Sequence, residues 1–288
     1  MTRLIDQESG TDLMVSDAAG QIALPAPHLA PVATPEVRTG KPVRHGKSRW
    51  PARLDLLQSA SGLFLALFLM AHMFFVSSIL ISHDAFYYVA RFFEGEFFLG
   101  KPYPILVSGV VALILTIFVA HAWLAMRKFP AGYRQYRAFV AHKNNLRHGD
   151  TSLWWLQIWT GFALFFMATI HLYDMLMQPA LIGPYESADR VWTGNMWPLY
   201  LLLLLAAELH ASIGLYRLAI KWGWFDSAKP NLSRRRLLWA KHGISAFYIT
   251  LGLVTLAAYV DLGRAHADKA GERYVPTHLS APAATGKH

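Results

Sequence analysis

The chain has 288 residues, of which 54% are hydrophobic and only 16% are charged, and its formal net charge is +9. Soluble domains typically carry about 25% charged residues, so this composition excludes an ordinary soluble domain and indicates a membrane protein. The positive charges lie between apolar blocks, which argues against nucleic acid as a partner. Because the chain has no cysteine, disulfides and thiolate-ligated iron–sulfur clusters are excluded, and any metal must use histidine, methionine or carboxylate ligands.

Residues 1–46 are rich in alanine and proline and show no apolar periodicity, which predicts a disordered N-terminal tail. They also lack the apolar region of a secretory signal. Residues 47–263 are expected to form the membrane domain, and residues 264–288 are expected to form a flexible C-terminal tail.

Five apolar segments within the membrane domain are each long enough to cross a hydrocarbon core of roughly 30 Å as a helix. Their expected limits are Leu54–Ile81, Pro104–Met126, Leu153–Met177, Pro198–Ile220 and Leu238–Val260. The sequence therefore predicts an all-α membrane protein with five transmembrane helices. Lysine and arginine are concentrated before the first segment, between the second and third, and between the fourth and fifth. The positive-inside rule then places the N-terminus in the cytoplasm and the C-terminus in the periplasm.

Each of the first four segments carries one histidine, and these are His72, His121, His171 and His210. A single buried histidine is most simply a core residue with a hydrogen-bond partner, but four of them, one per helix, favour ligation of haem iron. A rise of about 1.5 Å per residue places His72 and His171 toward the outer face and the other two toward the inner face. The sequence thus predicts two bis-histidine haems b inside a bundle of the first four helices, which suits electron transfer.

Glu208 lies two residues before His210, which places the two side chains about 200° apart around the helix. The two side chains are therefore expected to face different parts of the interior. Ionisable groups at membrane depth are rare and usually functional, so Glu208 is a candidate proton relay. The alternative is a protonated carboxyl that hydrogen-bonds to a neighbouring helix.

Literal motifs recur in order along residues 45–262, among them Gln58-Ser-Ala-Ser-Gly-Leu-Phe-Leu, Ala71-His-Met-Phe-Phe-Val-Ser, His121-Ala-Trp-Leu-Ala-Met-Arg-Lys-Phe-Pro and Glu208-Leu-His. With all four histidines in place, the chain closely resembles the dihaem cytochrome b subunit of bacterial quinol:fumarate reductases and succinate:quinone reductases, particularly the epsilonproteobacterial five-helix type. The match is poor around Ser82-His83-Asp84 and in both terminal tails.

The resemblance implies that one haem is held by the first and third histidines and the other by the second and fourth. It also implies a quinol proton acceptor in the first outer loop, at Glu94, whose alternative role is a solvated acid beside Glu96. Glu208 matches a glutamate proposed to carry protons across the membrane. His148 lies at a helix end as an interfacial residue and is a candidate neighbour of a haem propionate. The other residues implied to lie near the haems are Gln58, Ser59, Trp154, Lys221 and Arg190.

The family is expected to oxidise menaquinol, or reduce menaquinone, and to exchange electrons with an iron–sulfur subunit and a flavoprotein on the cytoplasmic face. The chain would then anchor a fumarate reductase or succinate dehydrogenase in the bacterial inner membrane, and a dimer of such heterotrimers is compatible with this. Since the sequence has no cysteine and no dinucleotide-binding motif, the dicarboxylate chemistry is expected to belong to the partners.

Two alternatives remain open at this point. One is the cytochrome b subunit of a membrane hydrogenase or formate dehydrogenase, and a copurifying covalent flavoprotein would distinguish it. The other is a proton-coupled transporter that uses Glu208 and the histidines as a relay. A reduced haem α-band in a visible spectrum would exclude the transporter, and it would exclude a haem-free membrane anchor as well.

Overall fold

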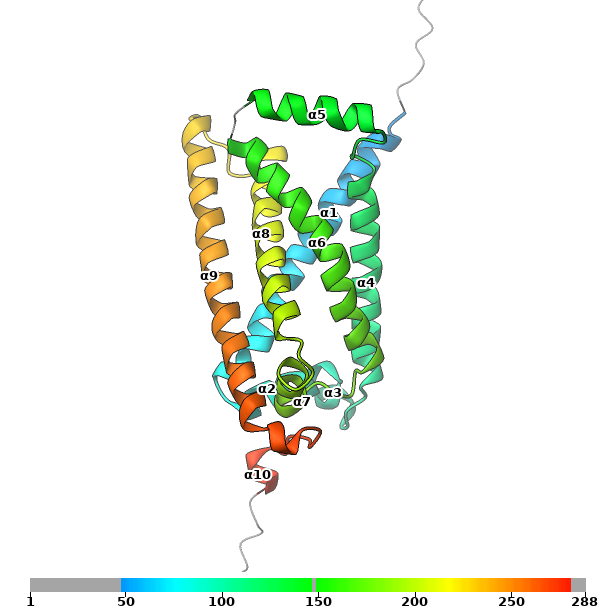
Figure 1. Ribbon diagram of the computed structural model, residues 1–288, viewed down its shortest axis with the longest axis vertical. Helices are drawn as coiled ribbons and strands as arrows, with labels where there is room; N and C mark the ends of the chain where they lie inside the picture. The colour runs from blue at the N-terminus through cyan, green and yellow to red at the C-terminus, as the bar shows by residue number, and fades with distance from the viewer. Residues whose placement is uncertain (1–47, 147–148, 281–288) are drawn as a thin grey trace, which may run out of the picture. The chain divides into compact units, whose positions relative to one another are not determined.

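The computed structural model describes residues 48–146 and 149–280. Five long helices dominate this part of the chain (Figure 1), and each is long and apolar enough to cross a membrane. They are α1 (Trp50–Ser77), α4 (Ile105–Met126), α6 (Gly149–Met177), α8 (Trp197–Lys221) and α9 (Pro230–Ala265). The described ranges contain no strand. The prediction of an all-α membrane protein with five spanning helices is therefore confirmed.

All of the long helices except α4 begin before the apolar segments expected from the sequence. The clearest case is α9, which is 36 residues long and so measures about 54 Å, well beyond the hydrocarbon core. It begins at Pro230, because a proline at the first helical position loses no intrahelical hydrogen bond. Its first turns are polar, and there Arg234 forms an ion pair with Asp150 at the start of α6. Hydropathy identifies only the apolar part of such a helix, which explains the difference.

Short helices gather at the two ends of the long ones (Figure 1). At one end α5 (Tyr133–Leu146) lies across the ends of its neighbours, and we call this the α5 end. The opposite end, here the α2/α7 end, carries several short elements. These are the 3-10 helix η1 (Ser78–Leu80), α2 (His83–Phe93), α3 (Glu96–Leu99), α7 (Pro184–Val191), the 3-10 helix η2 (Ala267–Lys269) and α10 (Thr277–Ser280).

Four of the long helices form a ring in which α1 packs on α4, α4 on α6, α6 on α8, and α8 on α1. The fifth, α9, packs on the outside of this ring against α8 and α1. Hydroxyl pairs support that contact: Ser77 Oγ lies 2.7 Å from Thr255 Oγ1, and Ser245 Oγ donates to Ser212 Oγ at 2.7 Å. Interhelical hydrogen bonds of this kind are common between membrane helices, where apolar burial alone gives little driving force.

Candidate functional site

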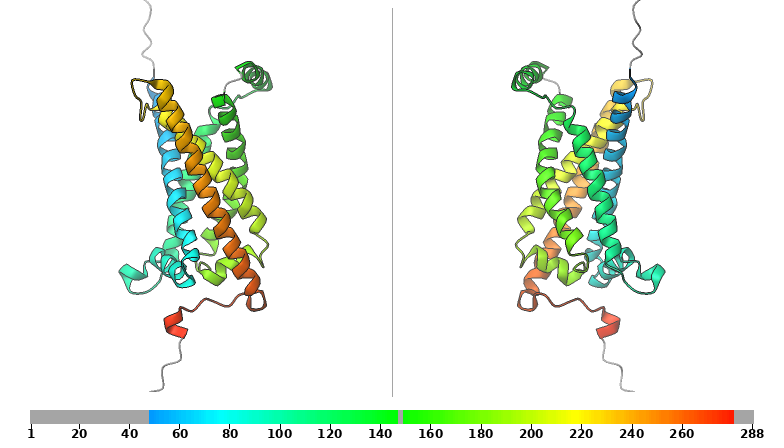
Figure 2. Two further views of the ribbon diagram at one scale, coloured as in Figure 1. Left: turned by 90° about the vertical axis from the view of Figure 1, so that its left-hand side faces the viewer. Right: turned by 90° about the vertical axis from the view of Figure 1, so that its right-hand side faces the viewer.

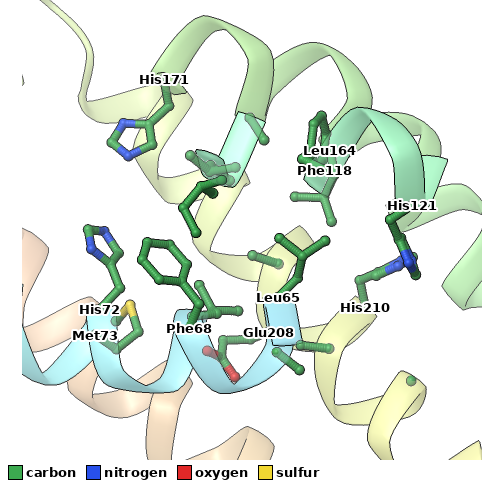
Figure 3. Close-up of a pocket in the computed structure, with 18 of the residues that line it drawn as sticks. Leu65, Phe68, His72, Met73, Phe118, His121, Leu164, His171, Glu208 and His210 are labelled. Carbon is green, nitrogen blue, oxygen red and sulfur yellow. The ribbon is translucent and has the colours of Figure 1, made fainter. Parts of the chain in front are cut away.

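A largely apolar cavity of about 1240 Å³ lies inside the ring of α1, α4, α6 and α8. All four intramembrane histidines line it, together with Glu208. Pockets that hold one drug-sized ligand usually measure about 300–1,000 Å³, so this cavity has room for more than one such group. Figure 3 shows the histidines in two pairs at opposite ends of the cavity, with labelled apolar side chains between them.

The pair nearer the α2/α7 end is His72 of α1 and His171 of α6. Their ring centroids are 6.2 Å apart and the ring planes are inclined by 53°. A metal–imidazole bond of about 2.0 Å on each side, extended by the ring radii, requires roughly 6 Å between centroids. In the described part of the chain, His171 Nδ1 is buried without a hydrogen-bond partner. The spacing of the two rings thus fits a single metal ion between them.

The second pair is His121 of α4 and His210 of α8, which lie beside each other in Figure 3. His210 Nδ1–H donates to the carbonyl oxygen of Gln157 at 2.9 Å. Ser61 Oγ donates to a backbone carbonyl of its own helix, so it accepts from His121 Nδ1–H at 3.0 Å. A histidine whose Nδ1–H is engaged in this way presents Nε2 as the free metal-ligating nitrogen.

Two glycines that the sequence reasoning missed let this second pair pack close to the neighbouring helices. A Cβ atom built at Gly62 of α1 would stand 2.8 Å from Cε1 of His121. One built at Gly161 of α6 would stand 3.0 Å from Cε1 of His210. Both positions therefore have no room for a side chain while the imidazoles keep their places.

A repeated spacing in the sequence could have revealed these glycines. Residues 58–72 and 157–171 share the pattern Gln-x-x-Ser/Thr-Gly followed ten residues later by His. In each repeat the final histidine belongs to the pair at the α2/α7 end, while the glycine supports a histidine of the other pair. Helices α1 and α6 thus contribute to both pairs in the same way.

Within residues 48–146 and 149–280, no three or more His, Asp or Glu side chains gather around a common point. A metal ion at either histidine pair therefore needs further ligands from outside the chain. A haem brings four nitrogens of its own and needs only two axial histidines, so the donor sets fit haem iron.

Glu208 is 2% exposed and occupies a different face of α8 from His210. Figure 3 shows its carboxyl group directed away from the imidazole of His210, as the 200° separation predicts. Among the described residues, its Oε1 atom is buried without a hydrogen-bond partner. A carboxyl group in such a place is costly to ionise without a partner, and such groups commonly mark proton pathways.

Glu94 caps the C-terminus of α2 and is 1% exposed, so it is not a solvated loop acid. It forms an ion pair with Arg91. Burial raises the pKa of Glu94 above the ordinary glutamate value, while the positive charge of Arg91 opposes this rise. In the structure as described, Glu94 does not itself line the cavity, but the preceding residue, Phe93, does.

Comparison with known proteins settles the family. Residues 133–251 match the model of the succinate dehydrogenase/fumarate reductase transmembrane subunit family. The chain is 54% identical over 222 residues to the fumarate reductase cytochrome b subunit of Wolinella succinogenes, an alignment that covers 77% of this chain and 87% of that protein. The chain belongs to the fumarate reductase cytochrome b subunit family. It is also 58% identical over 217 residues to the Helicobacter pylori subunit, covering 75% and 84% of the two chains.

Membership of the fumarate reductase cytochrome b family confirms the resemblance drawn from the motifs and disfavours the hydrogenase and formate dehydrogenase alternative. Such a chain is a membrane anchor within an oxidoreductase complex.

Four of the residues predicted to lie near haems line the cavity toward the α5 end, and they are Gln58, Ser59, Trp154 and Lys221. Lys221 Nζ donates to Ser59 Oγ at 2.8 Å and forms an ion pair with Asp55, a residue not anticipated from the sequence. Asp55 also pairs with Lys128. The side-chain oxygen of Gln58 is buried without a partner among the described atoms. These groups give the cavity a polar edge that includes the cation of Lys221, whereas His148 lies outside the described residues.

Arg190, the remaining predicted contact, lies at the α2/α7 end and also lines the cavity. Its Nε is 2.7 Å from Asp174 Oδ2, and its guanidinium donates to the carbonyl oxygen of Leu181 at 2.7 Å. The structure thus brings Arg190 to the end of the cavity that holds the His72–His171 pair.

Proposed function

We propose that this cytochrome b subunit carries two haems b and transfers electrons between menaquinol and an iron–sulfur subunit. One haem would be held by His72 and His171, and the other by His121 and His210. The observation that carries the proposal is the presence of two facing histidine pairs at opposite ends of one cavity. Bound haem iron supplies one-electron exchange, and bis-histidine ligation leaves no open position for oxygen chemistry.

The chain's own groups would hold and isolate these cofactors. The carbonyl of Gln157 and the hydroxyl of Ser61 fix the orientation of two imidazoles, and Gly62 and Gly161 leave the space that those rings occupy. The apolar lining excludes water. At the α5 end, Lys221 offers a cation that a haem carboxylate would share with Asp55.

Quinol chemistry is assigned to the α2/α7 end. Oxidation of a menaquinol releases two electrons and two protons, and Glu94 would accept the protons in turn as its carboxylate and pass each to the solvent at this end. Arg91 keeps that carboxylate charged despite its burial. The positive-inside rule assigns this end to the periplasmic side and the N-terminus to the cytoplasm.

Glu208 would relay protons across the membrane beside the electron path. An iron–sulfur subunit and a flavoprotein would dock at the basic α5 end, where the flavoprotein interconverts fumarate and succinate, and two such heterotrimers would form a dimer. The absence of cysteine from the chain supports this division of labour, because the chain cannot build an iron–sulfur cluster itself.

Haem content tests the proposal. His210→Ala should reduce the haem b content of the purified complex from two per chain to one, and His72→Ala should remove the other haem. His142→Ala, at an exposed position of α5, serves as the control and should keep both haems. Two haems per chain in the His210→Ala complex would overturn the ligand assignment.

A further inference from the structure

Beyond α9, and beyond residue 262 where the motif resemblance ends, the chain turns back over the α2/α7 end. Figure 2 shows the segment leaving α9 and running along that end to α10. We call residues 266–280 the C-terminal strap.

The strap is fixed to α2 at Asp84. Tyr274 Oη donates to Asp84 Oδ1 at 2.7 Å, and Thr277 donates from its backbone N–H to Oδ1 at 3.2 Å and from its hydroxyl to Oδ2 at 2.5 Å. These hydrogen bonds hold the pKa of Asp84 below its ordinary value. An ionised carboxylate that accepts several bonds is a stronger anchor than a neutral one.

A second anchor fixes the strap to α7. Asp189 accepts from His266 Nδ1–H at 2.9 Å and from the backbone N–H of Gly271 at 2.8 Å. The ring of His266 is stacked on that of Tyr185, with centroids 4.1 Å apart. Because anchors lie on both sides of Tyr274, the position of this tyrosine along α2 is well defined.

From Tyr274 a row of contacts leads along α2 to the proposed proton acceptor. The Tyr274 ring packs against that of Tyr87 at 6.0 Å, and the guanidinium of Arg91 lies 4.8 Å from the centroid of the Tyr87 ring. Arg91 in turn forms the ion pair with Glu94. Asp84, Tyr87, Arg91 and Glu94 are spaced by three, four and three residues, which places them on one face of α2.

The strap also acts on Glu94 through charge. The charged groups that face Glu94 are Arg91 from α2, Glu96 from α3 and Arg273 from the strap. The two arginines favour the ionised carboxylate and Glu96 disfavours it. Arg273 directly precedes Tyr274, so the anchor at Asp84 also sets where this second positive charge lies.

We propose that the C-terminal strap positions the Arg91–Glu94 pair for quinol oxidation, with Tyr274 acting through Tyr87 and Arg273 acting directly on Glu94. Tyr274 is in this sense a positioning residue. The proposal rests on the proposed role of Glu94 as proton acceptor. A strap that merely stabilised the outer loops would leave the acid–base behaviour of the reaction unchanged, and this difference makes the two roles separable.

The test is the pH dependence of quinol-driven fumarate reduction by the whole complex in membranes. Tyr274→Phe and Arg273→Gln should each move the acid limb of the profile to higher pH, by about 0.5 unit. Arg273→Gln removes a positive charge that favours ionised Glu94, and Tyr274→Phe breaks the hydrogen bond to Asp84 that helps to hold Arg91 and Arg273 in place. Tyr88→Phe is the matched control. It loses a contact of 3.2 Å between α2 and His278 of the strap that does not lead to Arg91, and its profile should match the wild type.

Double variants separate the two routes. In an Arg91→Gln background, Tyr274→Phe should add a smaller shift than it causes in the wild type, because only its effect on the position of Arg273 remains, whereas Arg273→Gln should still add its full shift. A reduced visible spectrum that matches the wild type shows that each variant keeps its haems. If the Tyr274→Phe variant loses its haems, the Arg273→Gln variant still tests the strap proposal, because Arg273 lies at an exposed position.

The outcomes distinguish this inference from the proposed function. If Arg91→Gln moves the acid limb but neither strap variant does, the strap proposal is wrong and the role of Glu94 stands. If Glu94→Gln leaves quinol turnover unchanged, the proposed function of Glu94 fails, and the strap proposal fails with it.

Discussion

At the scale of single residues, Gly62 controls how closely His121 can pack on α1. An added methyl group would stand 2.8 Å from the imidazole, so Gly62→Ala must turn the ring away and break its contact with Ser61. On the proposed ligand assignment, we expect this variant to lose most of one haem per chain. Gly109→Ala, at an α4 position with nothing within 4 Å, should keep both. Quantitative haem spectra make the comparison, and full haem content in Gly62→Ala would contradict the expected crowding.

The burial of Glu94 predicts how quinol oxidation should depend on pH. Burial raises its pKa, and a proton acceptor must be ionised, so activity should fall as the pH decreases through that raised value. The acid limb of quinol oxidation should therefore lie above the ordinary glutamate pKa of about 4.3. Arg91→Gln removes the cation that opposes the effect of burial and should move the limb to still higher pH. Initial rates across the pH range measure this, and a shift to lower pH would exclude Glu94 as the base.

Among the structural elements, α9 differs from the other long helices because it carries none of the four intramembrane histidines and joins α1 and α8 partly through hydroxyl pairs. Ser245→Ala removes the bond to Ser212 and should lower the free energy of unfolding by about 0.6 kcal/mol, the average for such bonds in membranes. The haem spectrum should not change. Thermal unfolding in detergent measures the loss, with the exposed Thr250→Ala as the control. Haem loss in Ser245→Ala would show that α9 shapes the cavity directly.

The long and the short helices differ in how well a sequence predicts them. A run of about 20 apolar residues is sufficient to identify a spanning helix, so all five were predicted. The helices α2 and α7 were not, because at 11 and 8 residues they are short and only one face of each is apolar. Their positions follow from contacts with α9 and the strap, which no local pattern encodes.

The two neighbouring acids of the first outer loop, Glu94 and Glu96, show most clearly what the sequence alone cannot predict. Glu94 is 1% exposed, whereas the side chain of Glu96 is 42% exposed. Gly95 between them has a φ of +81°, a left-handed conformation that ends α2 and turns the chain into α3. A Cβ atom at Gly95 would also stand 2.6 Å from Leu106. The sequence indicates a glycine turn, but only the packing on α4 decides which acid is buried.

Depth along a helix, by contrast, was predictable because it follows from counting residues. That count paired the histidines, and the structure brings His72 to His171 and His121 to His210. The ion pair of Asp55 with Lys221 depends on how α1 crosses α8, which residue counting cannot supply.

At the scale of the whole molecule, the proposed reaction moves charge across the membrane. Under the proposed function, quinol would be oxidised at the α2/α7 end and electrons would leave at the α5 end, so each electron would cross most of the hydrocarbon core. Moving one elementary charge against a membrane potential costs about 2.3 kcal/mol per 100 mV. A proton that moves with each electron would remove this cost. Glu208 is a buried carboxyl between the two ends, and its Oε1 atom has no hydrogen-bond partner among the described residues.

Glu208→Gln in proteoliposomes that contain the whole complex tests this coupling. Glutamine keeps the size of the side chain but cannot carry a proton, so electron transfer should become electrogenic, with turnover slowing as the membrane potential builds up. A protonophore should restore the rate of the variant and leave the wild-type rate nearly unchanged. A potential-sensitive dye and the rate of fumarate reduction are recorded together. If the variant is equally slow with and without the protonophore, Glu208 serves the fold or the haem environment rather than proton transfer.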